Sequence, residues 1–265
     1  MVLHSSRKQF LKWSVIEMLD MEIIDIHCHF DHGAVGESAK RNELHKADLA
    51  FLKKERERLG IKKTFMSSFS SVCSTERIYE ENEYLFEKMQ KATWLYQWVV
   101  LDPREKRLFS QVESLLKKDK IVGIKIHPEL HKYEILDYAD EIFAFANEHK
   151  TTVLMHPPAT IVKTAAVADK YPDMNLIIAH LGVMEHIDAI ANAKHGNVYT
   201  DTSGQASYKN NILEYAVEKV GSEKIFFGTD TYSCAFQVGR ILLAGISKKD
   251  KENILRNNAI KFFIK

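Results

Sequence analysis

Short apolar runs rich in β-branched residues recur along the chain and alternate with segments whose apolar residues follow a helical spacing. Runs of about four to eight such residues, bounded by turn formers, are typical of strands. The predicted strands are residues 23–30, 64–69, 94–101, 121–127, 152–156, 176–180, 198–203 and 225–230. Strands that alternate with helices indicate βαβ units and a parallel sheet. Eight units in 265 residues predict one closed (β/α)₈ barrel, the TIM-barrel fold.

The segments between the predicted strands carry amphipathic helical patterns, for example at Leu108, Val112 and Leu115. Since no linker or low-complexity stretch interrupts the sequence, we expect a single domain that spans residues 21–265. Residues 1–20 contain apolar residues at helical spacing and predict a short helix in front of the barrel. A natural start at Met21 is the alternative.

Composition and charge narrow the function classes. The chain is 45% hydrophobic and 28% charged, which is typical of a globular protein. Its 37 basic and 36 acidic residues give a formal net charge of +1, so nothing favours nucleic acid or an anionic membrane as partner. No apolar run approaches the roughly 18 residues that span a bilayer. The three cysteines form no CxxC pair, and a reducing cytoplasm fits them best.

The first predicted strand contains a His-x-His pair. Residues two apart on a strand point to the same face, so we expect Asp25, His27 and His29 to face one way and Cys28 the other. Two imidazoles at this spacing can chelate one ion from a rigid element. Taken alone, however, such a pair is a weak signal.

Three further polar residues strengthen the metal hypothesis because each closes a predicted strand. His156, His180 and Asp230 end apolar runs and are followed by loops. The carboxyl ends of barrel strands meet at one rim, where active sites are built. We therefore predict a site for one or two divalent metal ions. Ligands of nitrogen and oxygen without sulfur favour Zn²⁺, with Mn²⁺, Fe²⁺ or Co²⁺ as alternatives.

The same residues suggest roles in catalysis. Asp230 is the candidate general base that takes a proton from a metal-activated water. His180 either binds a second metal or polarises the substrate. Lys125 shares a face with His127 on the fourth strand and has three open roles: a carboxylated bridge between two metals, a partner for a substrate carboxylate, or a structural ion pair. His127, at the strand tip, is a substrate-binding candidate.

Other polar residues receive a structural interpretation. Asp201, at the end of the seventh strand, either orients a ligand histidine or is an ordinary turn carboxylate. The remaining histidines, His131 and His186 among them, fall in helical or loop patterns and are expected at the surface or in helix caps.

Together these segments resemble the amidohydrolase superfamily, specifically the amidohydrolase-related group of small metal-dependent barrels. The matching segments are DIHCH at 25–29, GIKIHP at 123–128, MHPP at 155–158, IIAHLG at 177–182, YTDTSG at 199–204, FFGTD at 226–230 and ILRNNAIKFF at 254–263. The resemblance implies that His27, His29 and His156 are metal ligands. It makes Asp230 a ligand or proton shuttle, and His180 a second-metal ligand or a group that acts on the substrate.

The resemblance also bounds the reaction. Members are similar in hydrolysing amide, lactone or ester-like bonds of small molecules, and a related branch decarboxylates aromatic acids. We therefore expect a metal-dependent hydrolase, with a decarboxylase as the alternative and a non-catalytic metal-binding barrel as a third reading. Substrate loops vary most in this superfamily, so the substrate does not follow from it. Barrels of this kind often pair, which is compatible with a homo-oligomer.

Overall fold

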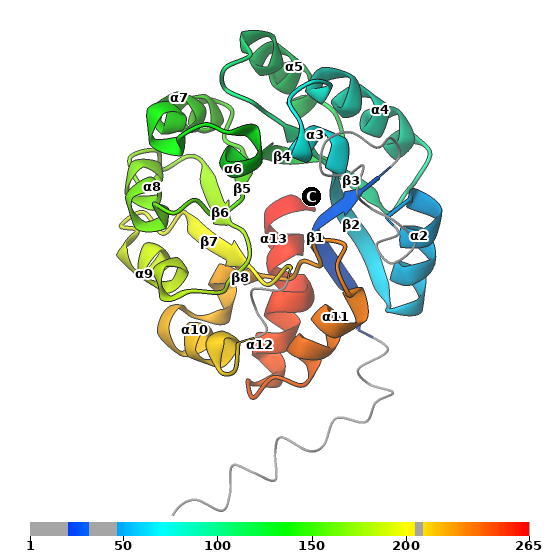
Figure 1. Cartoon of the computed structure of the whole chain (residues 1–265). Coiled ribbons are helices and arrows are strands. Elements are labelled where there is room, and N and C mark those ends of the chain that lie inside the picture. Colours follow the sequence, from blue (N-terminus) through cyan, green and yellow to red (C-terminus); the bar gives the residue numbers. More distant parts are fainter. Residues whose placement is uncertain (1–20, 32–46, 205–208, 265) are drawn as a thin grey trace, which may run out of the picture.

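Eight parallel strands, joined in chain order from β1 to β8, form the centre of the molecule (Figure 1). The computed structural model describes residues 21–31, 47–204 and 209–264. The strands are β1 (Ile23–Phe30), β2 (Ile61–Ser68), β3 (Leu95–Val100), β4 (Ile121–Ile126), β5 (Thr152–Met155), β6 (Asn175–Ile178), β7 (Val198–Asp201) and β8 (Ile225–Phe226). The predicted (β/α)₈ barrel is confirmed. The predicted helix within residues 1–20 lies outside the described part of the chain.

Backbone hydrogen bonds bring the eighth strand back to the first. The Ile26 amide donates to the carbonyl of Phe227 at 2.9 Å, and the amides of Thr229 and Asp230 donate to the carbonyl of His27 at 3.0 and 2.7 Å. These bonds nearly close the sheet into a barrel. They also place Asp230 beside His27, although 203 residues separate the two in sequence.

Most helices surround the strands on the outside, as alternation of the two element types predicts, whereas the C-terminal helix lies over the centre of the barrel (Figure 1). In chain order, the helices are α2 (Leu49–Arg58), α3 (Phe69–Cys73), α4 (Ile78–Gln90), α5 (Lys106–Leu116), α6 (Pro128–His131), α7 (Ile135–Glu148), α8 (Ile161–Ala168), α9 (Met184–Asn192), α10 (Ile212–Val220), α11 (Cys234–Leu242), α12 (Lys248–Glu252) and α13 (Asn258–Phe263), with a 3₁₀ turn η4 (Ser222–Lys224) and a π-helical turn η5 (Asn253–Asn257). Most bury one apolar stripe against the sheet.

A layer of aromatic side chains fills the barrel below the strand tips. Phe263 of α13 meets Phe65 and Trp98 with ring centroids 5.3 and 5.6 Å apart, and Phe262 meets Tyr199 at 4.9 Å. Phe65 and Trp98 are buried strand residues, and Tyr199 precedes Asp201 on β7. The C-terminal helix therefore packs on the barrel interior, while polar groups occupy the carboxyl ends of the strands.

An irregularity in β1 corrects one expectation from sequence. The register between β1 and β2 shifts between Asp25 and Cys28, so strict alternation of side chains fails there. Ile26 packs in the same apolar cluster as Phe65 and Trp98, inside the barrel. Asp25 instead accepts hydrogen bonds from the Thr229 hydroxyl at 2.7 Å and from the Thr229 amide. The prediction that Asp25 shares a face with His27 and His29 is wrong.

The strands also end earlier than the apolar runs suggest. β5, β6 and β8 stop at Met155, Ile178 and Phe226, so His156, His180 and Asp230 lie in the loops that follow. His180 and Asp230 adopt left-handed backbone conformations, with φ of 63° and 53°, far from the extended backbone of a regular strand. The predicted strand-end residues therefore lie in the loops, one, two and four residues beyond the ends of β5, β6 and β8.

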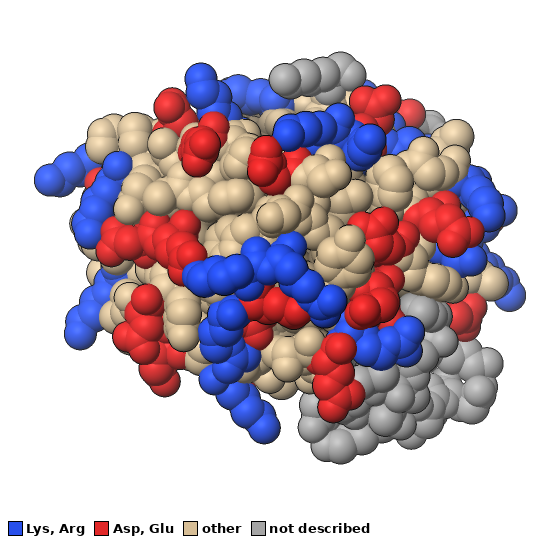
Figure 2. Space-filling view, turned by 90° about the horizontal axis from the view of Figure 1, so that it is seen from above, with Lys and Arg blue, Asp and Glu red and all other residues tan. Residues whose placement is uncertain are grey.

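The surface agrees with the near-zero net charge. On the face seen in Figure 2, basic and acidic side chains intermingle. Among the helices that the structure describes, none combines the length and apolar character needed to cross a membrane.

Candidate metal and active site

Three predicted ligands converge at the carboxyl ends of the strands. Nε2 of His27 lies 3.2 Å from Nε2 of His29. Oδ1 of Asp230 lies 3.2 Å from Nε2 of His29 and 3.7 Å from Nε2 of His27. The imidazoles are buried, and Asp230 keeps a small exposed edge. Because the ligand atoms all lie within 4.8 Å of one another, one ion can contact all three.

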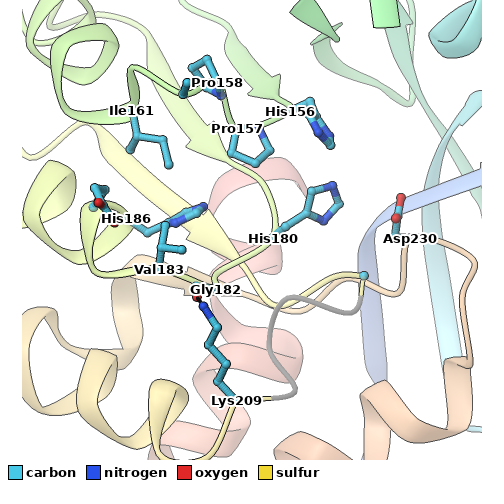
Figure 3. A pocket seen from close by; sticks show the side chains of 13 residues that line it. His156, Pro157, Pro158, Ile161, His180, Gly182, Val183, His186, Lys209 and Asp230 are labelled. Atoms are coloured by element: carbon cyan, nitrogen blue, oxygen red, sulfur yellow. Dashed lines mark hydrogen bonds between the residues drawn. The ribbon is translucent and has the colours of Figure 1, made fainter. Parts of the chain in front are cut away.

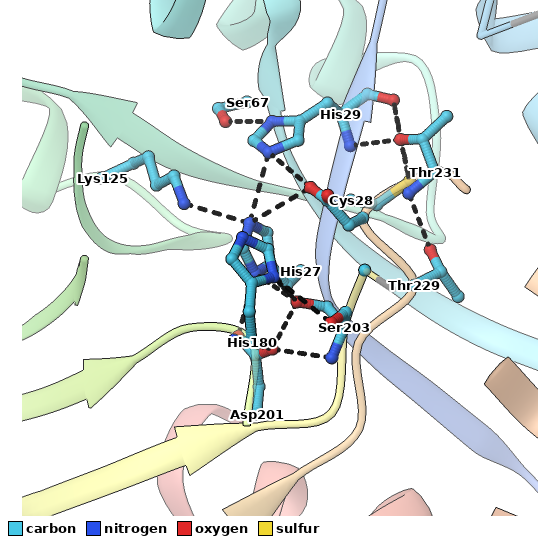
Figure 4. A network of polar contacts seen from close by, with 12 residues as sticks. His27, Cys28, His29, Ser67, Lys125, His180, Asp201, Ser203, Thr229 and Thr231 are labelled. Atoms are coloured by element: carbon cyan, nitrogen blue, oxygen red, sulfur yellow. Dashed lines mark hydrogen bonds and ion pairs between the residues drawn. The ribbon is translucent and has the colours of Figure 1, made fainter. Parts of the chain in front are cut away.

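Hydrogen bonds behind the two histidines aim them at this centre (Figure 4). Nδ1 of His27 lies 2.9 Å from Oδ2 of Asp201, so the ring carries its proton there and turns the Nε2 lone pair inward. Nδ1 of His29 lies 2.8 Å from the Ser67 hydroxyl. A set of two imidazole nitrogens and one carboxylate oxygen suits Zn²⁺ or Mn²⁺. The residues present fit a divalent metal.

Electrostatics favour the same conclusion. Burial lowers the pKa of His27 to about 3, and the charge of Lys125 acts in the same direction. Burial also lowers the pKa of His29. For Asp230 burial acts upward, but His180, His29 and His27 outweigh it and hold its pKa well below the ordinary value. Neutral imidazoles and an ionised carboxylate are the forms that bind a cation.

Lys125 and His127 come from β4 and its end. Lys125 is completely buried, and its Nζ lies 3.0 Å from Nε2 of His27. Burial lowers the pKa of Lys125 to about 8. Nδ1 of His127 accepts a hydrogen bond from the Leu130 amide at 3.3 Å, which caps α6 and fixes the ring at the rim. Both side chains face the same small chamber as His29.

His156 stands apart from the converging group. Its Nε2 lies 3.1 Å from Oε2 of Glu129, and its ring stacks on His127 at a centroid distance of 3.9 Å. Among the described residues it belongs to no set of three close ligand atoms. It nevertheless faces the same cavity as His180 and Asp230 (Figure 3).

His180 lies against the first histidine. Its ring stacks on that of His27 with centroids 5.0 Å apart, and its Nδ1 lies 2.9 Å from the Ser203 hydroxyl. The left-handed conformations of His180, Asp230 and Thr231 each cost on the order of 1–3 kcal/mol. Thr231 is β-branched, and its hydroxyl bonds both the amide and the carbonyl of His29. Three residues of the candidate site therefore carry backbone strain.

The sequence pattern did not predict the roles of several residues in the site. Ser67 and Ser203 contact the histidines only because the barrel brings distant strand ends together. Asp201 does take the orienting role that was one of its two readings. His131 and His186 are buried rather than exposed: the Nε2 of each lies 2.9 Å from a backbone carbonyl, of Ser71 and of Ala179, so they attach α6 and α9 to neighbouring segments.

Two adjoining chambers open on this group. The larger, about 630 Å³, has apolar walls from Pro157, Pro158, Ile161 and Val183 (Figure 3). The smaller, about 230 Å³, contains the polar groups of Lys125, His127 and His29. His156, His180 and Asp230 line both chambers. The metal-ligand group thus lies where an apolar pocket meets a polar one, an arrangement typical of a small-molecule site.

The sequence matches the family model described as Amidohydrolase over residues 24–264. The chain belongs to the amidohydrolase family, as the resemblance of its motifs predicts, and it is an enzyme of that superfamily. A comparison with curated proteins found no match.

Several solved structures share the fold. The 2,6-dihydroxybenzoate decarboxylase from Rhizobium has a TM-score of 0.74 at 15% identity, over 92% of this chain and 98% of that chain. The 5-carboxyvanillate decarboxylase from Novosphingobium aromaticivorans, solved with manganese, has 0.71 at 14% identity, over 92% and 96%. A proposed 2-pyrone-4,6-dicarboxylic acid hydrolase from Pseudomonas putida has 0.68 at 16% identity, over 92% and 97%. At these identities the likeness establishes the fold alone.

Proposed function

We propose that this chain is a metal-dependent decarboxylase of an aromatic carboxylic acid. The observation that carries the proposal is the convergence of His27, His29 and Asp230 at the junction of a polar and an apolar chamber. Two of the similar structures described above are decarboxylases of substituted benzoates, which supports this reading over the hydrolase expected from sequence.

In this proposal His27, His29 and Asp230 hold the metal. His156 and His180 stay proposed ligands on the resemblance of their strand-end motifs. When bound, a divalent ion supplies Lewis-acid polarisation of a substrate oxygen. Zn²⁺ remains our sequence-based expectation, and the manganese of the 5-carboxyvanillate enzyme makes Mn²⁺ the first alternative.

The two chambers suit the two ends of such a substrate. The apolar walls of Pro157, Ile161 and Val183 exclude water from a flat ring. Lys125 and His127 in the polar chamber offer hydrogen-bond donors to a carboxylate. A substrate that spans both chambers brings the ring carbon that bears the carboxylate next to Asp230, which lines both.

Asp230 is the proposed proton carrier. Loss of CO₂ leaves an electron pair on the ring carbon, which must take up a proton. Because its neighbours keep Asp230 ionised, it first accepts a proton from solvent or from a substrate hydroxyl and then delivers it to that carbon. The exposed edge of the carboxylate gives it access to such a donor.

The test uses the metal-loaded protein and a panel of hydroxybenzoic acids. We expect CO₂ and the matching phenol in equal amounts, and loss of both in Asp230→Asn. His195→Ala is the control and should leave the rate unchanged, since the hydrogen bonds of the exposed His195 ring within the described residues go to Asp169, outside the site. Protein with stoichiometric metal that releases no CO₂ from any member of the panel contradicts the decarboxylase.

Hydrolysis is the second candidate because the ionised Asp230 can equally accept a proton from water, and because one similar structure is a proposed hydrolase. Lactones and pyrones incubated in H₂¹⁸O separate the two reactions. Hydrolysis places ¹⁸O in the product carboxylate, whereas decarboxylation gives a product without incorporated oxygen.

A cytoplasmic location and a homo-oligomeric state also remain proposals. Fractionation of the producing cells tests the first, and light scattering of the purified protein tests the second.

A further inference from the structure

The Ser203 hydroxyl occupies a position between two histidines of the site. Ser203 follows β7, is completely buried, and its Oγ lies 2.9 Å from Nδ1 of His27 and 2.9 Å from Nδ1 of His180 (Figure 4). The same oxygen is hydrogen-bonded to Oδ1 of Asp201. One hydroxyl therefore has three polar neighbours, but it carries a single hydrogen and two lone pairs.

The neighbours of Asp201 decide where that hydrogen lies. Oδ1 of Asp201 accepts from the backbone amides of Ser203 at 2.8 Å and His180 at 3.2 Å, and amides can only donate. This oxygen is therefore an acceptor without a proton of its own. The hydrogen in its contact with Ser203 must come from the serine hydroxyl.

With its hydrogen committed to Asp201, Ser203 has only lone pairs for the two histidines. Nδ1 of His180 must then carry the proton, and the carbonyl oxygen of Ser203, 3.3 Å away, is a second acceptor for it. Nδ1 of His27 likewise donates, to Ser203 and to Oδ2 of Asp201.

The reverse assignment leaves two unfavourable contacts. If Ser203 donated to His180, its oxygen would face the oxygen of Asp201 with no hydrogen between them. The bare Nδ1 of His180 would also face the carbonyl of Ser203. Buried lone pairs that face one another cost the energy of an unsatisfied polar group, so this assignment is disfavoured.

We propose that Ser203 is a positioning residue that fixes His27 and His180 together as their Nδ1–H tautomers. Both rings then present the Nε2 lone pair to the site. A neutral His180 consequently accepts a hydrogen bond or binds a cation, and it does not polarise a substrate carbonyl by donating. The inference rests on the proposed placement of these histidines in the site, but not on the type of reaction.

The same assignment of donors and acceptors explains why a second group of potential metal ligands lies close together: His27, His180 and Asp201. Their Nδ1 and carboxylate atoms satisfy one another through Ser203 and need no ion among them. Any cation is therefore bound on the Nε2 side of the rings.

The tautomers are measured directly by long-range ¹H–¹⁵N correlation spectra of the metal-free protein labelled on histidine. We expect wild-type His27 and His180 both to be protonated on Nδ1. In Ser203→Ala, His180 loses its main acceptor and gains the Nε2–H form, whereas His27 keeps Nδ1–H because Asp201 remains.

Ser67→Ala is the matched control, because it removes a buried hydroxyl that contacts only His29 among the site histidines. It should change the His29 signals and leave His180 as it is. Titration with Mn²⁺ gives a second readout: Ser203→Ala should weaken binding about 10–100-fold, as loss of an orienting partner does.

A wild-type spectrum with His180 protonated on Nε2 overturns the proposal, and it needs no variant to fold. A Ser203→Ala protein in which His180 remains purely Nδ1–H overturns it as well. Neither measurement requires turnover, so a failure to find a substrate leaves the tautomer result standing.

Discussion

Nδ1 of His27 donates to Oδ2 of Asp201 at 2.9 Å, and both side chains are completely buried. The bond joins β1 to β7 across the position of β8 and spans 174 residues of sequence. Desolvation of Asp201 acts to raise its pKa, but His27, with smaller contributions from His180 and Ser203, lowers the pKa overall. This pair therefore fixes both the orientation and the proton position of a proposed metal ligand.

Replacing Asp201 by Asn tests that role. The amide keeps the size of the side chain but loses the charge that holds the proton on Nδ1 of His27. We expect metal binding to weaken about 10–100-fold, measured by calorimetric titration with Mn²⁺ or Zn²⁺. Asp169→Asn is the control, because it changes a similar carboxylate–imidazole contact with His195 on the surface. Equal affinity of Asp201→Asn and wild type would falsify the role.

Gly204 provides a steric test of the site. Its φ is +67°, and a Cβ there would lie 3.0 Å from Nδ1 of His180 and 3.3 Å from Oδ2 of Asp230. Gly204→Ala should destabilise the fold by about 1–2 kcal/mol through its left-handed backbone, and lower activity further by displacing His180. Thermal unfolding and turnover measure the two effects.

Gly239→Ala is the natural comparison. Gly239 lies inside α11, and nothing within 4 Å meets an added Cβ. The substitution should raise stability by up to about 1 kcal/mol because alanine favours the helix. If both variants change the melting temperature in the same direction, the steric account of Gly204 fails.

The barrel was readable from sequence because its strands are short apolar runs separated by amphipathic helices. The extent of β2 was not: Lys62 and Lys63 look like a loop, yet they belong to the strand, where Lys63 bonds the hydroxyl of Tyr96. Tertiary pairing overrides local propensity in such strands.

Some residues of the candidate site could likewise be predicted from the sequence, and others could not. His27, His29 and Asp230 could be found because strand-end position is a property of the sequence. Ser203 could not be found in this way, because its hydrogen bond with His27 forms only when the fold brings together two residues that lie 176 positions apart in the chain. The shift of register at Asp25 was equally hidden, since a bulge needs a partner strand to be defined.

Metal removal should lower stability as well as activity. A ligand that binds only the folded state stabilises it by about 2.7 kcal/mol at a concentration of 100 times its Kd. Chelator-treated protein should therefore melt earlier, and added Mn²⁺ or Zn²⁺ should restore the melting temperature. His29→Ala should lose this response, while His195→Ala keeps it, because His195 lies outside the group of ligand atoms. A His29→Ala protein that still responds contradicts the ligand assignment.

Asp102 and Arg104 predict a pH dependence away from the metal group. Arg104 donates to both carboxylate oxygens of Asp102, at 2.9 and 2.7 Å, and also to the carbonyl of His131. The pair thus attaches α6, which carries the Glu129 partner of His156, to the end of β3. Burial acts to raise the pKa of Asp102, but the hydrogen bonds from Arg104 lower it overall.

A carboxyl whose pKa is lower in the folded than in the unfolded chain stabilises the fold above its unfolded pKa, about 3.9 for aspartate. That contribution is lost as the pH falls through the folded pKa. We expect Asp102→Asn to be less stable than wild type at pH 7. This gap, the difference in the free energy of unfolding between the two proteins, should narrow as the pH falls below about 3.9. Urea unfolding at a series of pH values measures the gap.

The control repeats the comparison in an Arg104→Met background. Burial is then the largest remaining effect on the pKa of Asp102, so the gap should no longer narrow with acid. A gap that stays constant from pH 7 downward in the presence of Arg104 contradicts the lowered pKa.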